Sequence, residues 1–197
     1  MKTIYIYTDG ACSGNQSDLN IGGWGAILEY GEHQKEIFGG EINTTNNRME
    51  MLALLNALKA IKKPGYNISV FSDSSYLVNC FREKWYENWQ KNGWKNSKKK
   101  DVENRDLWEE LLHLISQHQI SFYRVKGHVN LNSDRIDKEA LYKKFIKWNG
   151  PHFTMDDFIS ITEKNNRADA LANKGIDSIR ESMPPTAAPE SEPPCHP

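Results

Sequence analysis

The chain begins with a strand pattern that runs directly into an acidic residue. β-branched and aromatic residues extend from Thr3 to Thr8, and Asp9-Gly10 follows them, so the pattern predicts a strand that ends at Asp9. A carboxylate at the end of a strand buried on both faces is costly unless a cation or a hydrogen bond compensates its charge. A turn aspartate that caps its own backbone is the simpler interpretation of Asp9 taken alone.

Strand and helix patterns alternate along the rest of the chain. Segments rich in β-branched and aromatic residues predict strands, and apolar residues three or four apart predict helices. The predicted strands cover residues 3–8, 24–30, 36–39, 68–72 and 120–125, and the predicted helices cover residues 49–61, 77–81, 104–115, 134–148, 154–162 and 167–179. This order predicts an α/β fold, with a mixed five-stranded sheet flanked by helices and a helical insertion before the last helix.

Length and composition fit one soluble domain with additions. The 197 residues, 38% hydrophobic and 26% charged, are enough to bury a core. We expect a single domain over residues 1–182, in which residues 129–165 form a helical insertion, and a disordered tail over residues 183–197. Six of the eight prolines fall in that tail, which has no aromatic residue and no apolar periodicity.

The sequence has no pattern of a membrane or secreted protein. No apolar run is long enough to span a bilayer, and the apolar start is too short for a signal peptide. Three cysteines at scattered spacing, Cys12, Cys80 and Cys195, favour reduced thiols. We therefore expect a cytoplasmic monomer without an obligate protein partner.

Four carboxylates stand at the boundaries of the predicted elements. Asp9 and Asp73 each follow a strand, Glu50 lies early in a helix, and Asp169 falls in the first turn of the predicted last helix. In open α/β sheets, strand ends at a switch in connection order are where sites form. Oxygen ligands without a cysteine or histidine set suit Mg²⁺ or Mn²⁺. Four independent helix caps would explain the same spacing, so the pattern alone leaves both interpretations open.

The short sequences around these acids carry a specific resemblance. Five of them occur in order: Thr8-Asp9-Gly10-Ala11-Cys12, Thr44-Thr45-Asn46-Asn47-Arg48-Met49-Glu50, Ser72-Asp73-Ser74-Ser75-Tyr76, Val125-Lys126-Gly127-His128 and Asn166-Arg167-Ala168-Asp169. Together they resemble a type 1 ribonuclease H of the bacterial kind. The resemblance covers residues 2–128 and 165–180, and it leaves out only the insertion and the tail.

The resemblance implies an endonuclease that cleaves the RNA strand of RNA/DNA hybrids and leaves 5′-phosphate and 3′-hydroxyl ends. It implies two Mg²⁺ ions, for which Mn²⁺ is a substitute. Asp9 would bridge both ions, Asp169 would complete the ion that activates water, and Glu50 and Asp73 would hold the ion at the leaving oxygen. Such displacements develop charge on the entering and leaving oxygens, which two cations neutralise together.

His128 follows the last predicted strand and Gly127. A lone histidine is more often a surface residue than a catalyst. By resemblance, His128 would help to move protons and release product, with a smaller effect than the acids.

The net charge of the whole chain is −1, but one segment, residues 84–100, is strongly basic. It contains six lysines and one acid, Glu87, interleaved with tryptophans. Trp85 and Trp89 are one helical turn apart, which fits packing as well as stacking. The lysine excess favours phosphate contacts, and the segment resembles the basic protrusion of the bacterial enzymes.

The same resemblance implies the residues that bind a hybrid. Thr45 and Asn104 would hold a phosphate of the DNA strand, and Trp85 would lie against its sugar. Three asparagines would read the minor groove, where 2′-hydroxyls distinguish RNA from DNA. The implied substrate-binding residues are Asn15, Thr45, Asn46, Asn47, Trp85, Lys95, Lys98, Lys99 and Asn104.

The insertion is the main departure from the family. It places 40 residues between His128 and Asp169, and its apolar stripes predict two helices that pack on each other or on the body. Four acids near the starts of these helices fit capping better than a second metal site: Asp134, Asp137, Asp156 and Asp157.

Three alternatives remain beside a bacterial ribonuclease H. They are another nuclease on the same fold, a catalytically silent protein that binds RNA/DNA hybrids, and a detached reverse-transcriptase domain. The silent protein would be favoured by a missing acid, and all four acids are present.

Overall fold

A single mixed sheet of five strands forms the centre of the computed structural model, which describes residues 2–14 and 19–184. The strand order is β3-β2-β1-β4-β5. β2 pairs antiparallel with β1 and β3, whereas β4 pairs parallel with β1 and β5. This confirms the mixed five-stranded sheet. The strands are β1 (Ile4–Ser13), β2 (Ile21–Tyr30), β3 (His33–Ile42), β4 (Asn67–Ser72) and β5 (Gln119–Arg124).

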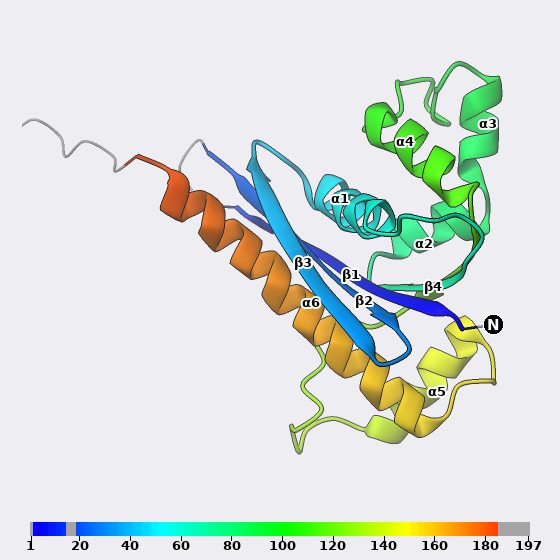
Figure 1. The fold of residues 1–197 in the computed structure, drawn as a ribbon, viewed down its shortest axis with the longest axis vertical. Helices are drawn as coiled ribbons and strands as arrows, with labels where there is room; N and C mark the ends of the chain where they lie inside the picture. The colour runs from blue at the N-terminus through cyan, green and yellow to red at the C-terminus, as the bar shows by residue number, and fades with distance from the viewer. Residues whose placement is uncertain (1, 15–18, 185–197) are drawn as a thin grey trace, which may run out of the picture.

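Helices cover both faces of the sheet (Figure 1). α1 to α4 lie over one face and enclose a core with Trp108 at its centre, and α6 crosses the other face. α5 packs beside β5 and α6. The helices are α1 (Asn46–Lys59), α2 (Ser75–Arg82), α3 (Trp85–Lys91), α4 (Arg105–Ile115), α5 (Lys138–Asn149) and α6 (Met155–Ser182).

β1 is longer than the sequence pattern predicts. It continues past Asp9 to Ser13, because β2 pairs with it along its whole length, whereas its parallel pairing with β4 stops at Thr8. Gly10 does not break the strand. It lets α1 approach, since a Cβ at Gly10 would lie 2.6 Å from the Glu50 backbone nitrogen. Asp9 therefore stands where β1 and β4 diverge, which is not the end of β1.

α6 is one helix where the sequence predicted two. It begins at a capping box formed by Thr154 and Asp157 and continues through Asn165 and Asn166 without interruption. The Asn166 side chain donates to the Val129 carbonyl at 2.8 Å and does not compete with the helix backbone. The prediction of Asp169 in a first helical turn is therefore wrong, because this residue lies in the middle of α6.

Glycines let α6 lie close against β2 and β3. A Cβ at Gly25 would lie 2.5 Å from the Ala168 carbonyl oxygen, and one at Gly175 would lie 2.0 Å from the Gly39 carbonyl oxygen. Side chains at either position would push the helix away from the sheet. These contacts fix the height of α6, and therefore of Asp169, above the strands.

The residues of the insertion share a core with the sheet. Phe145 of α5 and Phe158 of α6 are buried in one cluster with Tyr7 and Phe71. Aromatic rings link them, with ring centroids 5.5 Å apart between Phe145 and Phe158. The two helical stretches thus pack on the body of the protein as well as on each other. Whether residues 129–165 form a separable unit stays a prediction.

Within residues 2–14 and 19–184, no helix has the length and apolarity needed to cross a membrane. Most of the tail expected to be disordered lies outside the described residues, as does Cys195.

Candidate active site

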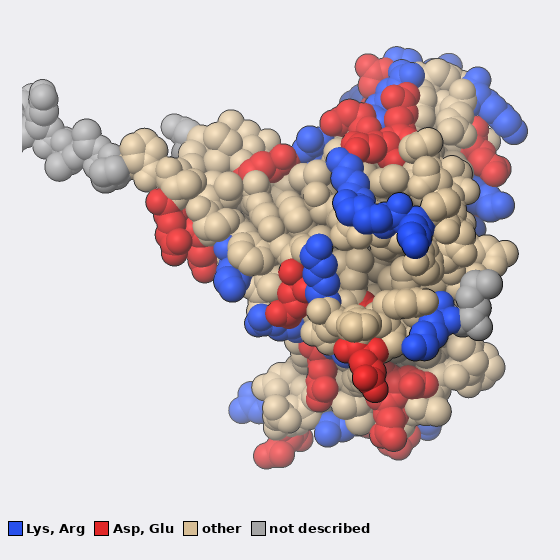
Figure 2. Space-filling model, viewed as in Figure 1, with Lys and Arg blue, Asp and Glu red and all other residues tan. Residues whose placement is uncertain are grey.

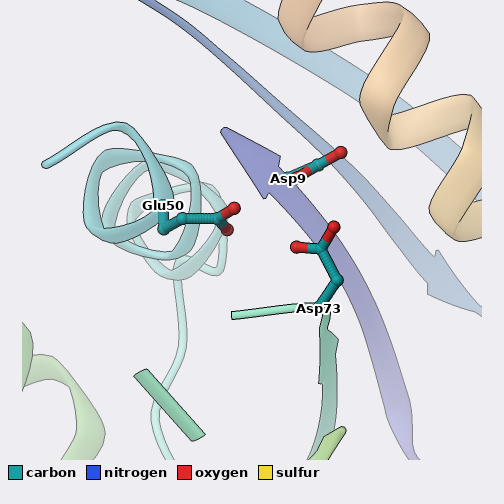
Figure 3. A group of neighbouring side chains, drawn as sticks. All are labelled: Asp9, Glu50 and Asp73. Atoms are coloured by element: carbon teal, nitrogen blue, oxygen red, sulfur yellow. The ribbon is translucent and has the colours of Figure 1, made fainter. Parts of the chain in front are cut away.

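Three carboxylates converge where β1 and β4 diverge (Figure 3). Asp9 comes from β1, Glu50 from the first turns of α1, and Asp73 from the residue after β4. Each offers a carboxylate oxygen within 4.8 Å of the other two. In the part of the chain that the structure describes, no other group of three or more acids, histidines or cysteines comes this close.

Burial makes this cluster electrostatically unfavourable without a cation. Asp9 is 3% exposed and Glu50 is 7% exposed. Burial, followed by the charge of Asp73, raises the pKa of Asp9 to about 8. Burial and the charges of Asp9 and Asp73 raise the pKa of Glu50 well above its ordinary value, and burial raises that of Asp73. A bound cation would reverse these shifts.

The local sequence explains how the carboxylates come together. The Gly10 backbone N–H donates to Asp9 Oδ1 at 2.8 Å, and the missing side chain at Gly10 leaves room for the backbone of Glu50. Gly127 has the same role beside Asp73, because a Cβ there would lie 2.4 Å from Asp73 Oδ2. Glu50 Oε2 is buried and has no hydrogen-bond partner, so it is an available ligand atom. These residues fit a divalent metal ion.

Asp169 and His128 form the exposed side of the site. Asp169 lies close enough for its charge to raise the pKa of both Asp9 and Asp73. His128 Nδ1 lies 3.9 Å from Asp169 Oδ2, and the histidine side chain is 77% exposed. The backbone of His128 is left-handed, with φ of 56°. Its side chain is therefore held at the edge of the cluster, in contact with solvent.

A second polar group joins the starts of α1 and α4. Thr45 caps α1 by accepting from the Arg48 backbone N–H at 3.2 Å. Arg48 Nη1 donates to Asn104 Oδ1 at 3.3 Å. Arg48 thus contacts both predicted phosphate-binding residues, Thr45 through its backbone and Asn104 through its guanidinium. Asn104 stands at the N-cap position of α4 with φ of 59°, and its side chain makes no capping hydrogen bond there.

Arg48 is a member of this polar group that the sequence reasoning did not single out. Its side chain also pairs with Glu41, with Nε and Oε1 2.6 Å apart, and this pairing raises the pKa of Arg48. The available signal was its position three residues after Thr45, which places both on one helical face. Asn46 and Asn47 are exposed in the first turn of α1, and Asn15 lies outside the described residues.

The basic segment folds as α3 and a loop beside α4 (Figure 1). Trp89 and Trp94 are buried in the core around Trp108, so packing is the correct interpretation for these two. Trp85 is half-buried at the start of α3 and donates through Nε1 to Glu83 at 2.6 Å.

The lysines of this segment differ in their partners. Lys95 pairs with Asp101, whereas Lys98 and Lys99 are exposed and make no ion pair within the described part of the chain. Figure 2 shows basic side chains at the outer margin of this region and acidic ones over α4.

The expected helix caps in the insertion are partly confirmed. Asp137 accepts from the Ala140 backbone N–H at the start of α5, and Asp157 closes the capping box of α6. They do not join a metal-type cluster in the described residues.

A mixed sheet in this strand order, with buried carboxylates where its central strands diverge, defines the ribonuclease H-like class of fold. The sequence model of the RNase H family matches residues 1–177. The chain belongs to the ribonuclease H family.

Relatives and solved structures agree with this family. Ribonuclease H of Syntrophomonas wolfei is 59% identical over 145 residues, 72% of this chain and 97% of that protein. Ribonuclease H of Caldanaerobacter subterraneus is 52% identical over 152 residues, 75% of this chain and 96% of that protein.

Among solved structures, LC9-RNase H1, described as a type 1 RNase H with the type 2 active-site motif, superposes with a TM-score of 0.65 and 22% identity. That match covers 90% of this chain and 73% of LC9-RNase H1. LC11-RNase H1, solved in complex with an RNA/DNA hybrid, superposes with a TM-score of 0.51 and 21% identity over 90% of this chain and 99% of that one. At these identities, the superpositions establish the fold.

Proposed function

We propose that this protein is an endonuclease that hydrolyses the RNA strand of RNA/DNA hybrids, leaving 5′-phosphate and 3′-hydroxyl ends. The observation that carries the proposal is the buried cluster of Asp9, Glu50 and Asp73, with carboxylate oxygens within 4.8 Å of one another, in a chain of the ribonuclease H family. The presence of all four acids disfavours a silent hybrid-binding protein.

The carboxylates would hold two Mg²⁺ ions, with Mn²⁺ as a substitute. Bound there, the ions would supply an activated water and neutralise charge on the entering and leaving oxygens. Asp9 is the residue best placed to serve both ions, because it neighbours Glu50 and Asp73 as well as Asp169. The raised pKa of Asp9, about 8, fits this role, because burial and then the charges of Asp73 and Asp169 disfavour its carboxylate without a cation.

His128 would carry protons between the site and solvent. Its ring is exposed and lies 3.9 Å from Asp169, so it can exchange a proton with water while remaining near the reacting phosphate. A histidine suits this task because its charge changes near neutral pH. Its removal should reduce turnover without abolishing it.

The hybrid would contact three groups of residues. Thr45, Asn104 and Arg48 would bind a DNA phosphate, because Arg48 joins the other two and offers charged donors. Asparagines suit minor-groove reading because they offer both a donor and an acceptor. Further contacts would come from the asparagines Asn15, Asn46 and Asn47 and from four residues of the basic segment, Trp85, Lys95, Lys98 and Lys99.

The test is cleavage of a hybrid labelled at the RNA 5′ end, with and without Mg²⁺. Cleavage should require Mg²⁺ and spare duplex DNA, duplex RNA and single-stranded RNA. Asp9→Asn should abolish it while hybrid binding persists, since the shape of the site is kept and a charge is lost. Full activity in Asp9→Asn would refute the metal assignment, and efficient incision at a single ribonucleotide within DNA would indicate a different substrate class.

We also propose a cytoplasmic monomer in which residues 1–182 form one domain and residues 183–197 a tail. The scattered cysteines support a reducing compartment. Light scattering of the purified protein would test the oligomeric state.

A further inference from the structure

α5 and the end of β5 carry an excess of positive charge that the active site described above does not use. Segments 124–128 and 138–149 together contain six lysines or arginines and a single acid, Glu139. All five of these lysines are exposed. The six cations are Arg124, Lys126, Lys138, Lys143, Lys144 and Lys147.

Two of these cations, Arg124 and Lys144, lie over the ring of Trp148. The Arg124 guanidinium lies 4.0 Å from the centroid of the Trp148 ring, and Lys144 Nζ lies 5.0 Å from it. The backbone of Trp148 is fixed in turn, because its carbonyl accepts from Arg82 Nη1 at 2.9 Å. Asn149 anchors the end of α5 by bonding both backbone groups of Arg124.

No neighbouring carboxylate neutralises this surface. Among the described residues, none of the exposed lysines of α5 and none of Arg124 and Lys126 lies within 4.0 Å of an acid. Elsewhere on the body, such pairs are made, for example Lys164 with Glu29 at 2.7 Å and Arg167 with Glu36 at 2.6 Å. Two cations over one aromatic ring repel each other, so the arrangement favours an anion that both can share.

The surface is continuous with the active site. Lys126 precedes His128 by two residues, and Lys126 and Lys144 line the same small cavity beside Trp148. The surface is also on the other side of the sheet from the basic segment. α5 packs on the core shared with α6, whereas α3 packs on the core around Trp108. The active site lies between two cationic regions.

We infer that Arg124, Lys126, Lys143, Lys144 and Lys147, the α5 cationic surface, form a second phosphate-binding surface for the backbone of a bound RNA/DNA hybrid. This inference rests on the proposed function. A duplex carries closely spaced phosphates along its whole length. A duplex that reaches from the basic segment across the active site therefore offers phosphates to cations beyond His128. The insertion would lengthen the contact with the hybrid without entering the chemistry.

The test is the salt dependence of hybrid binding, measured by fluorescence anisotropy without divalent ions so that no cleavage occurs. The variant is Lys143→Gln/Lys144→Gln/Lys147→Gln. The control is Lys35→Gln/Lys62→Gln/Lys63→Gln, three exposed lysines around the hollow between the β2–β3 hairpin and the end of α1. Figure 2 shows basic side chains gathered over that end of α1. Both variants remove three positive charges, so net charge alone cannot explain a difference.

The α5 variant should bind hybrid more weakly, and the slope of log affinity against log salt should flatten by about 0.9 for each lost phosphate contact, up to about 2.7. The control should retain the wild-type slope. An unchanged slope in the α5 variant, or an equal change in the control, overturns the inference. The double variant Lys143→Gln/Lys147→Gln, which leaves the Lys144 contact with Trp148 intact, provides the same readout should the triple variant unfold.

Failure of the proposed function gives a different result. If the wild-type protein cleaves hybrids but the α5 variant binds them with the wild-type salt slope, the second surface is overturned and the proposed function is not affected. If the wild-type protein cleaves no hybrid but the α5 variant still shows a flattened salt slope, the surface is supported and the proposed function is refuted.

Discussion

Asn149 tests whether the insertion is part of the folded core. Its side chain bonds the backbone of Arg124, the last residue of β5, as the backbone of a neighbouring strand would. Asn149 Oδ1 accepts from the Arg124 backbone N–H at 2.9 Å, and its Nδ2 donates to the Arg124 carbonyl at 2.8 Å. Oδ1 also accepts from Arg82 Nη2 at 2.9 Å, which ties α5 to the end of α2. We predict that Asn149→Ala destabilises the whole domain.

The magnitude follows from these bonds. Asn149 is 8% exposed, and its truncation leaves three polar groups of Arg124 and Arg82 without their partner. A buried group left unpaired costs about 1–3 kcal/mol. Arg124 is half-buried and Arg82 is exposed, so water can replace part of what is lost. We therefore expect a loss of about 2–4 kcal/mol in the free energy of unfolding.

Urea denaturation followed by tryptophan fluorescence measures this loss. With a slope of about 2–3 kcal/mol per molar urea, the midpoint should fall by about 1–2 M. Asn149→Asp keeps the acceptor and removes the donor, so it should lie between alanine and wild type. Asn88→Ala, on the exposed face of α3, is the control and should stay within about 0.5 kcal/mol of wild type.

A loss of less than about 0.5 kcal/mol in the free energy of unfolding of Asn149→Ala would refute the reasoning. It would mean that α5 can leave the edge of β5 without cost to the sheet. The insertion would then be an appendage, although its aromatic residues are buried with those of β1 and β4.

Three other predictions follow from the site. Because the pKa of Asp9 is raised from 3.8 to about 8, its contribution to stability is present at low pH and lost as the pH rises through about 8. The metal-free protein should therefore melt at a lower temperature at pH 9 than at pH 6, and Asp9→Asn should remove part of that dependence. Gly25→Val should cost more than about 3 kcal/mol in urea denaturation, since a Cβ there would lie 2.5 Å from the Ala168 carbonyl oxygen. Replacing Lys95, Lys98 and Lys99 with glutamine should raise KM for a hybrid and leave kcat nearly unchanged, as steady-state kinetics would show.

The sequence was sufficient for most of the elements around the site. The two predicted strands 24–30 and 36–39 flank Tyr30-Gly31, which predicts a turn between antiparallel strands, and Gly31 adopts a left-handed φ of 61° there. Thr44-Thr45-Asn46-Asn47, ahead of the predicted helix 49–61, is a capping signal, and Thr45 caps α1. These features depend on neighbouring residues, so a local pattern is enough to identify them.

Contacts between distant residues were harder to predict. The extent of β1 is set by β2, which begins several residues after β1 ends and pairs with it as far as Ser13. The role of Gly10 depends on how closely α1 crosses the strand. In the same way, Arg48 became recognisable as a site residue only when α4 brought Asn104 to it. No periodicity in the sequence encodes such contacts.

The length of α6 connects the insertion with the active site. A straight helix of 28 residues extends over about 42 Å at 1.5 Å per residue. Its first half packs through Phe158 and Ile161 on the core shared with α5. Its second half is fixed by the close contacts of Gly25 with Ala168 and of Gly23 with Ala172. Asp169 lies in the second of these regions, between Ala168 and Ala172.

The position of Asp169 therefore depends first on the close contacts of α6 with β2. Packing of the first half of α6 on the core shared with α5 supports the same rigid helix. In a shorter helix that began near Asp169, fraying of the first turn would loosen the carboxylate. In α6 the residue is three turns from the capping box, so its backbone is fully hydrogen-bonded within the helix. The insertion thus stabilises the exposed side of the site through the helix backbone, in addition to any contact that α5 makes with substrate.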